Sequence, residues 1–132
     1  MQLNVSTDYA VRIVLFLAQQ NMKNSAEISK AMKIPSNYVV PVAKRLAEAG
    51  IIKINKGRYG GYYLARPTWD INLLEIINAM EGTTRINRCL EADHYCSRNS
   101  CDTCPVRKSY VQLQSQLDDT LGSITIESLL RS

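Results

Sequence analysis

All four cysteines of the chain lie within one polar segment, together with its only histidine. They are Cys89, Cys96, Cys101 and Cys104, and the histidine is His94. Thiolates are the soft ligands that iron–sulfur clusters and zinc ions select. The Cys101-x2-Cys104 spacing is compatible with structural zinc, but zinc modules usually pair two such knuckles, and the longer Cys89-to-Cys96 spacing fits them poorly. Reactive thiols or a regulatory disulfide are a further alternative.

Inert cysteines explain this segment poorly. Unpaired cysteine is usually buried in proteins, whereas residues 89–104 are rich in Asp, Glu, Arg, Ser and Asn. We expect His94 to be a solvated loop residue rather than a ligand. The segment therefore predicts either a metal centre or thiol chemistry.

The composition indicates a single domain that works in a reducing compartment. The chain has 132 residues, of which 45% are hydrophobic and 21% are charged. No apolar run approaches the roughly 18 residues needed to cross a bilayer, and the first residues lack the basic region of a signal peptide. We therefore expect a cytoplasmic protein with no membrane partner. In the cytoplasm, clustered cysteines more often hold metals or serve redox chemistry than form structural disulfides.

Basic charge is concentrated in the N-terminal half of the chain. Residues 1–66 contain ten Lys and Arg against three Asp and Glu, whereas residues 67–132 contain six against nine. This asymmetry indicates a nucleic-acid-facing end, with an unevenly charged solvated surface as the alternative.

Three helices are predicted in the first 50 residues. The almost continuously apolar residues 8–20 indicate a buried helix. Residues 25–32 and 37–49 form two shorter helices joined by a few residues, which is typical of a helix-turn-helix. The expected N-caps are Ser6 or Thr7, Ser25 and Ser36, and the expected C-cap of the third helix is Gly50.

The third helix has an apolar face and a polar face. Helical spacing predicts a buried face made of Val39, Val42, Ala43, Leu46 and Ala47. The opposite face can contact bases and phosphates; with the cap residue Ser36 it comprises Asn37, Tyr38, Pro41, Lys44, Arg45 and Glu48. Pro41 is expected to bend or loosen the helix near its start. A pair of core helices with a polar outer face is the alternative.

A β-hairpin is predicted directly after the helix-turn-helix. Residues 51–55 and 62–66 are β-prone, and the glycine-rich residues 56–61 between them form the tip. A hairpin at this point makes the unit a winged helix. Lys56, Arg58 and Tyr59 at the tip can reach phosphates or the minor groove.

The C-terminal part is predicted to contain two further helices. Asp70 is expected to cap a helix over residues 71–81, and Pro105 to open a long helix over residues 105–121. The long helix carries an apolar stripe of Val106, Tyr110, Leu113, Leu117 and Leu121. A second copy of the chain is the expected partner of this stripe, giving a C2 homodimer that reads a palindromic site. The alternative is packing against the chain's own first helix.

Catalytic motifs are not found in the sequence. It contains no nucleophile elbow, no phosphate-binding loop and no dinucleotide fingerprint, and its one histidine has no triad context. We therefore expect a binding protein rather than an enzyme.

The motifs and their order resemble a known family. STDYAVRIVLFLA, the helix-turn-helix, the GRYGGYYLARP wing, INLLEIINAMEG and the cysteine segment are similar to the IscR/NsrR/CymR family (the Rrf-two superfamily) of bacterial transcriptional regulators. The resemblance covers nearly the whole chain. It implies a mostly α-helical winged-helix fold with a small hairpin wing and a long C-terminal dimerisation helix. It also implies a DNA-binding part at residues 1–82, a cluster-binding loop at 83–104 and a dimerisation part at 105–132.

The resemblance implies a cofactor and its ligands. Many members of that family bind an iron–sulfur cluster whose state sets DNA affinity, while members of the CymR type lack one. The implied ligand trio is Cys89, Cys96 and Cys104. Cys101 is then a spare thiol or an alternative third ligand, and Arg107 occupies a histidine slot of the family without being able to serve as a ligand. Asp8 stands where nitric-oxide-sensing members supply a carboxylate from the partner subunit, although it could also simply favour a helix N-terminus.

The resemblance also assigns DNA contacts. Asn37, Tyr38 and Lys56 match base- and phosphate-contacting positions of the family. Val40 and Pro41 replace a Glu-Gln pair of the iron–sulfur biogenesis regulators, so the operator preference is expected to differ from theirs.

The expected function is that of a homodimeric repressor that senses nitric oxide, redox state or iron–sulfur status through a [2Fe–2S] or [4Fe–4S] cluster. One rival is a cluster-free, CymR-like regulator controlled by a partner protein or by thiol oxidation. The other rival is a DNA-binding protein stapled by zinc.

Overall fold

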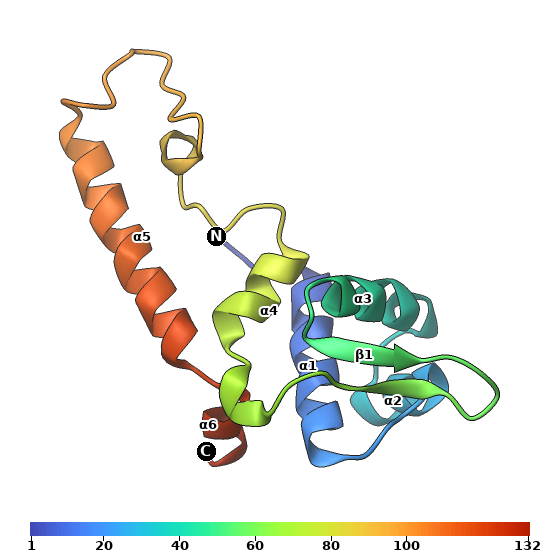
Figure 1. The fold of residues 1–132 in the computed structure, drawn as a ribbon. Helices are drawn as coiled ribbons and strands as arrows, with labels where there is room; N and C mark the ends of the chain where they lie inside the picture. Colours follow the sequence, from blue (N-terminus) through green and yellow to red (C-terminus); the bar gives the residue numbers. More distant parts are fainter.

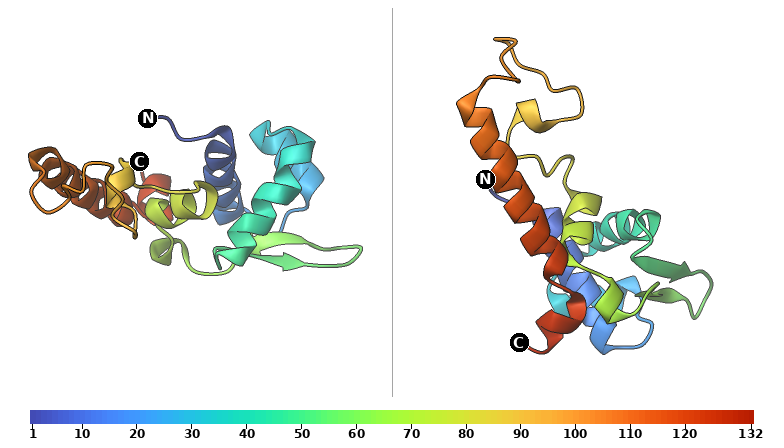
Figure 2. Two further views of the ribbon diagram at one scale, coloured as in Figure 1. Left: turned by 90° about the horizontal axis from the view of Figure 1, so that it is seen from above. Right: turned by 60° about the vertical axis from the view of Figure 1, so that its left-hand side comes forward.

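The computed structural model describes residues 1–132 and is mostly helical (Figures 1 and 2). The helices are α1 (Val5–Gln19), α2 (Ser25–Met32), α3 (Ser36–Glu48), α4 (Leu73–Met80), α5 (Pro105–Ser123) and α6 (Ile126–Leu130). There are also two short 3-10 helices: η1 (Thr68–Asp70) precedes α4, and η2 (Arg88–Leu90) contains the first cysteine, Cys89. Strands β1 (Ile52–Asn55) and β2 (Gly61–Leu64) form the only sheet.

Asparagine side chains, rather than the expected hydroxyl and aspartate groups, cap three of the helices. Asn4 accepts from the Thr7 amide at 3.2 Å in α1. In α2 and α4, Asn24 and Asn72 form reciprocal capping boxes with the glutamate three residues later. The predicted caps are therefore wrong. Ser6 and Thr7 lie inside α1, Ser25 is the first residue of α2, and Asp70 belongs to η1.

The third helix also differs at its ends from the prediction. Ser36 lies inside α3, whose N-cap is Pro35 and has no side-chain capping bond. The helix runs through Pro41 to Glu48 without a break. Ala49 is the C-cap, and Gly50 follows it with a φ of +76°, a left-handed conformation that suits glycine.

The core joins both ends of the chain. Ala10, Ile13, Val14 and Leu17 of α1 pack with the predicted face of α3, of which Val39, Val42, Ala43 and Leu46 are buried and Ala47 is half-buried. Ile126 of α6 is also fully buried in this cluster. Helix α6 was not predicted from the sequence. It packs against α1 and η1. The Ile126 amide donates to the carbonyl of Ile71 at 2.9 Å.

The hairpin has close backbone contacts at its base. Strands β1 and β2 are antiparallel with Ile52 opposite Leu64, and the Lys23 backbone pairs with Tyr62 beside them. A Cβ on Gly60 would lie 1.9 Å from the Asn55 carbonyl oxygen, so only glycine fits there.

We expect Gly60→Ala to lower the free energy of unfolding by about 1–3 kcal/mol, because backbone atoms must move to admit the methyl group. Gly82→Ala is the matched control, since a Cβ at Gly82 meets nothing within 4 Å. It should stay within about 0.5 kcal/mol of the parent. Chemical denaturation of the three proteins gives the comparison, and equal effects of the two substitutions would refute the close contact.

Helix α5 lies on the far side of α4 from α1 (Figures 1 and 2). It packs on α4 and η2 rather than along α1, so the alternative of packing against the first helix is wrong. Its stripe residues Val106, Leu113 and Leu117 are 52%, 52% and 37% exposed. An apolar face of this length remains uncovered in the single chain. None of the helices combines the length and the apolar composition that a membrane span requires.

Arg66 connects the hairpin to α4. Its guanidinium donates to the carbonyl of Asp70 at 2.8 Å and to Glu75 Oε1 at 2.7 Å, and it also reaches the carbonyl of Gly50. The hydrogen bond to Glu75 raises the pKa of Arg66. The base of the wing, the end of α3 and the start of α4 therefore meet at one side chain.

Candidate nucleic-acid interface and metal centre

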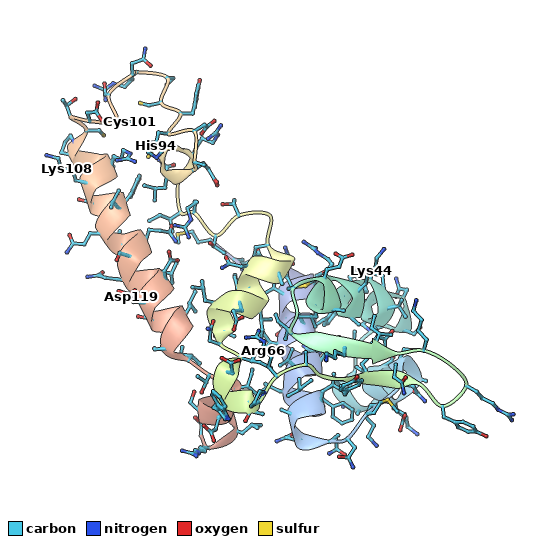
Figure 3. All side chains as sticks on the ribbon, in the orientation of Figure 1. Lys44, Arg66, His94, Cys101, Lys108 and Asp119 are labelled. Atoms are coloured by element: carbon cyan, nitrogen blue, oxygen red, sulfur yellow. The ribbon has the colours of Figure 1, made fainter.

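The polar face of α3 is free of other elements. The side chains predicted to contact DNA from this helix are exposed except for Tyr38, which is half-buried; the exposed ones are Ser36, Asn37, Pro41, Lys44 and Arg45. Lys44 points outward from the helix (Figure 3). The Tyr38 ring packs edge-on against Tyr9 of α1, with 5.1 Å between ring centres. This contact fixes the start of α3 against α1.

The wing extends the same surface. Lys56, Arg58 and Tyr59 are exposed at its tip, Tyr59 to 83%. The Arg58 guanidinium lies 5.6 Å from the centre of the Tyr59 ring. Because β1 packs beside α3, a helix that enters a major groove brings the wing to the neighbouring backbone or minor groove.

Asp8 lies on α1 and does not line the cysteine cavity in the single chain. Its carboxylate pairs with Arg12 at 2.7 Å. Arg12 also donates to the carbonyl of Met32 at 3.2 Å and lies 5.3 Å from the centre of the Tyr9 ring.

All four cysteines line one cavity of about 270 Å³ at the N-terminal end of α5. Figure 3 places Cys101 and His94 in this loop, at the opposite end of the molecule from the wing. The cavity is also lined by Arg88, Tyr95, Arg98, Arg107 and Tyr110. The four thiols are half-buried and unpaired. The structure therefore brings the four cysteines to one cavity, and their role as ligands stays a prediction.

Side-chain contacts stabilise the loop between Cys89 and Cys96. Arg88 and Asp93 form a two-pronged ion pair, with one N–O distance of 2.6 Å. This hydrogen bonding lowers the pKa of Asp93 to about 2. The Arg88 guanidinium also lies 5.3 Å from the centre of the Tyr95 ring. Sequence reasoning missed this cluster, although opposite charges five residues apart in a loop were a signal for it.

The thiols have different surroundings. Cys104 Sγ accepts the Arg107 amide at 3.4 Å and caps α5. Cys101 Sγ donates to the carbonyl of His94 at 3.0 Å. Backbone amides of Ser100 and Arg98 lower the pKa of Cys96, whereas desolvation and then the nearby Cys96 charge raise the pKa of Cys101.

The donor set fits a thiolate-bound metal, but the thiols are not assembled around a common point. No three of the His, Cys, Asp and Glu side chains lie close enough together to hold a metal ion. Ligation therefore requires residues 89–104 to close further around the metal. Arg107 is not a ligand but holds the first cysteine in place, because its Nε donates to the carbonyl of Cys89 at 3.4 Å.

The family model of Rrf2, described as an iron-dependent transcriptional regulator, matches residues 3–132. The chain belongs to the Rrf2 family of transcriptional regulators. It is a DNA-binding regulator and not an enzyme, as its sequence predicted.

Individual Rrf2 proteins support the same assignment. The regulator NsrR of Bacillus subtilis is 31% identical over 109 residues, which cover 80% of this chain and 72% of NsrR. NsrR of Bacillus licheniformis is 28% identical over 136 residues, covering 98% and 92%.

Solved structures of the family share the fold. CymR, the global cysteine regulator of B. subtilis, superposes with a TM-score of 0.78 at 23% identity, covering 98% of this chain and 95% of CymR. IscR of T. potens superposes with a TM-score of 0.76 at 22% identity, covering 99% and 87%. The predicted winged-helix fold class is therefore confirmed.

Proposed function

We propose that this Rrf2 protein is a homodimeric repressor whose operator affinity is set by an iron–sulfur cluster. The observation that carries the proposal is the gathering of all four cysteines on one cavity at the N-terminal end of α5. The cavity lies at the start of the helix whose apolar stripe has Val106, Leu113 and Leu117 exposed and available to a second subunit. The proposal divides the chain into a DNA-binding part (1–82), a cluster-binding loop (83–104) and a dimerisation part (105–132), working in the cytoplasm.

DNA is read by α3 and by the wing in this proposal. Asn37 and Tyr38 at the start of α3 contact base edges, and Lys44, Arg45 and Ser36 contact the adjacent bases and phosphates, with Pro41 shaping the surface between them. Lys56, Arg58 and Tyr59 contact the backbone or minor groove from the wing. The excess of Lys and Arg over Asp and Glu in residues 1–66 supports this orientation.

The dimer forms through the exposed face of α5. Its side chains Val106, Leu113 and Leu117 are exposed in the single chain, whereas a subunit interface would bury them. In a twofold-symmetric dimer the same stripe of a second α5 would cover them. Two subunits related by a twofold axis present two α3 helices, so the operator is a palindrome.

Cys89, Cys96 and Cys104 would hold the cluster, with Cys101 as a spare thiol or an alternative third ligand. Asp8 of the partner subunit would supply a carboxylate once its ion pair with Arg12 has opened. When bound, an iron–sulfur cluster supplies a centre that nitric oxide, oxygen or iron shortage can damage.

The chain's own contacts connect this site to the DNA-reading surface. Cys104 caps α5, α5 packs on α4, and Arg66 joins α4 to the wing and to the end of α3. A change in how the thiols are held therefore changes the placement of α5, and with it the relative placement of two α3 helices across the dimer.

A second candidate is a cluster-free regulator that responds to thiol oxidation or to a partner protein, or one that holds structural zinc. The specific observation in favour of its metal-free form is that no three ligands are already assembled, and this observation does not favour the zinc form. Anaerobic purification followed by visible absorbance and by iron, sulfide and zinc analysis tests the two. We expect a coloured protein with iron and sulfide in comparable amounts. A colourless, iron-free protein that still binds its operator would support the second candidate.

A further inference from the structure

Helix α5 has one buried residue, and that residue is polar. Gln114 is 4% exposed and is one of two buried polar side chains in the molecule. The residues on either side of it, Leu113 and Ser115, are exposed. A buried amide costs free energy unless its donor and its acceptor both find partners. The hydrogen-bond partners of Gln114 therefore identify the segment that it holds.

Both ends of the Gln114 amide bond to the backbone that leads into the cysteine loop. Its Oε1 accepts the Ile86 amide at 2.8 Å, and its Nε2 donates to the carbonyl of Thr84 at 3.1 Å. The two bonds flank Arg85 and reproduce the pairing that a neighbouring strand would give. Residues 84–86 are thereby held at a fixed position along α5.

Asp118, one turn further along α5, fixes which way the amide points. Its Oδ1 accepts from Gln114 Nε2 at 2.9 Å, and its Oδ2 accepts from Arg85 at 3.0 Å. A reversed amide would turn its oxygen toward this carboxylate and toward the Thr84 carbonyl. The three side chains therefore form one network with a single favoured arrangement.

The network determines where the first cysteine lies. Ile86 precedes Cys89 by three residues, and Gln114 follows Cys104 by ten, or about 15 Å along a helix. A segment held at Gln114 and running back along α5 brings Cys89 to the end of the helix that Cys104 caps. Arg107 completes this placement, since it donates to Cys104 Sγ and to the carbonyl of Cys89.

We propose that Gln114 is a positioning residue for the cysteine site: it holds residues 84–86 on α5 so that Cys89 stays beside Cys104. The role deepens the proposed function, on which its connection to a cluster rests, but the placement of the two cysteines can be measured without metal. Under this proposal Gln114 couples any movement of the cysteine loop to the middle of α5.

The metal-free test uses the full chain with Cys96→Ser and Cys101→Ser, so that Cys89 and Cys104 are the remaining thiols. Dibromobimane, a short reagent that fluoresces after bridging two thiols, reports their proximity. Gln114→Glu keeps the side-chain shape but removes the donor to Thr84 and sets a carboxylate against Asp118. Gln112→Glu, at an exposed position of the same helix, is the control with the same change of charge.

We expect the initial rate of cross-linking to fall about threefold or more in Gln114→Glu and to stay at the parent value in Gln112→Glu. Circular dichroism and thermal unfolding establish that each variant is folded. An unchanged rate in folded Gln114→Glu overturns the proposal. If that variant does not fold, Asp118→Ala takes its place, because it keeps both Gln114–backbone bonds but removes the carboxylate that orients the amide. Cross-linking must then be slower in Asp118→Ala than in the control Asp119→Ala. Equal rates in these two variants overturn the proposal as well.

The metal-dependent test uses the chain with all four cysteines. Iron release to a chelator after anaerobic reconstitution should be several-fold faster in Gln114→Glu than in Gln112→Glu, and equal rates would count against the proposal. A parent protein that takes up no iron, together with slower cross-linking in Gln114→Glu, would refute the cluster and leave the positioning role intact. Normal iron uptake by the parent together with unchanged cross-linking in Gln114→Glu would support the cluster and refute the positioning role.

Discussion

Replacing Cys104 with serine is expected to abolish iron–sulfur binding while leaving the fold intact. A serine hydroxyl stays protonated at neutral pH and is a hard donor, so it replaces a thiolate ligand poorly. Serine is nevertheless a good N-cap, and Cys104 caps α5 by accepting the Arg107 amide. The substitution therefore separates ligation from helix capping. Iron and sulfide per subunit after anaerobic reconstitution should fall at least about tenfold, with an unchanged circular dichroism spectrum.

Cys101→Ser is the matched control for this prediction. Cys101 lines the same cavity and is half-buried like Cys104, but it is the spare thiol of the proposed ligand set. Its serine variant should keep iron and sulfide within about twofold of the parent. The reverse result, with Cys101 essential and Cys104 dispensable, would move the third ligand to Cys101. Loss of iron in neither variant would contradict thiolate ligation at this end of the loop.

Removing the Asn37 side chain is expected to weaken operator binding by about 5- to 150-fold, the range of one lost base contact of roughly 1–3 kcal/mol. Asn37 is exposed at the start of α3 and lies outside the buried core. Asn37→Ala should therefore leave the thermal stability and the binding of unrelated DNA nearly unchanged. Fluorescence anisotropy with operator and scrambled duplexes at one salt concentration measures both affinities.

Arg58→Ala provides the contrasting variant. Arg58 lies at the exposed wing tip, where a guanidinium contacts phosphates or the minor groove. Its loss should weaken both duplexes and reduce the slope of log affinity against log salt by about one. If Asn37→Ala weakened both duplexes equally and Arg58→Ala affected the operator alone, the proposed roles of helix and wing would have to be exchanged.

The sequence predicted the architecture well because its signals are local. Three local signals each indicate an element without knowledge of the rest of the chain: the almost continuous apolar run of α1, the apolar periodicity of α3 and the glycine-rich tip of the wing. The caps were wrong where an asparagine one to three residues away from the expected serine, threonine or aspartate caps the helix instead. All these side chains can cap a helix, and only the backbone conformation decides between them. Helix α6 was missed because its five residues lack a periodic pattern, and its position depends on backbone pairing with residues 71–73.

The candidate site was predicted in composition but not in geometry. Cysteine spacing identified the four thiols that line the cavity. It gave no sign of the Arg88–Asp93 pair or of Gln114, because a glutamine on a long polar helix reads as solvated. Gln114 becomes buried only when residues 84–86 lie on α5, which is a long-range contact. The position of Asp8 relative to the cysteines of a second subunit likewise depends on assembly rather than on the sequence of one chain.

Control of operator affinity by an iron–sulfur cluster can be measured by comparing the same protein with and without its cluster. The protein is reconstituted anaerobically, half of it is stripped of iron, and both halves are titrated against the operator duplex at one salt concentration, beside the Cys104→Ser variant. We expect the affinity to differ between the two halves by about 5- to 150-fold and the variant to behave as the stripped protein under both treatments. Identical affinities of the iron-loaded and stripped halves would contradict control by the cluster.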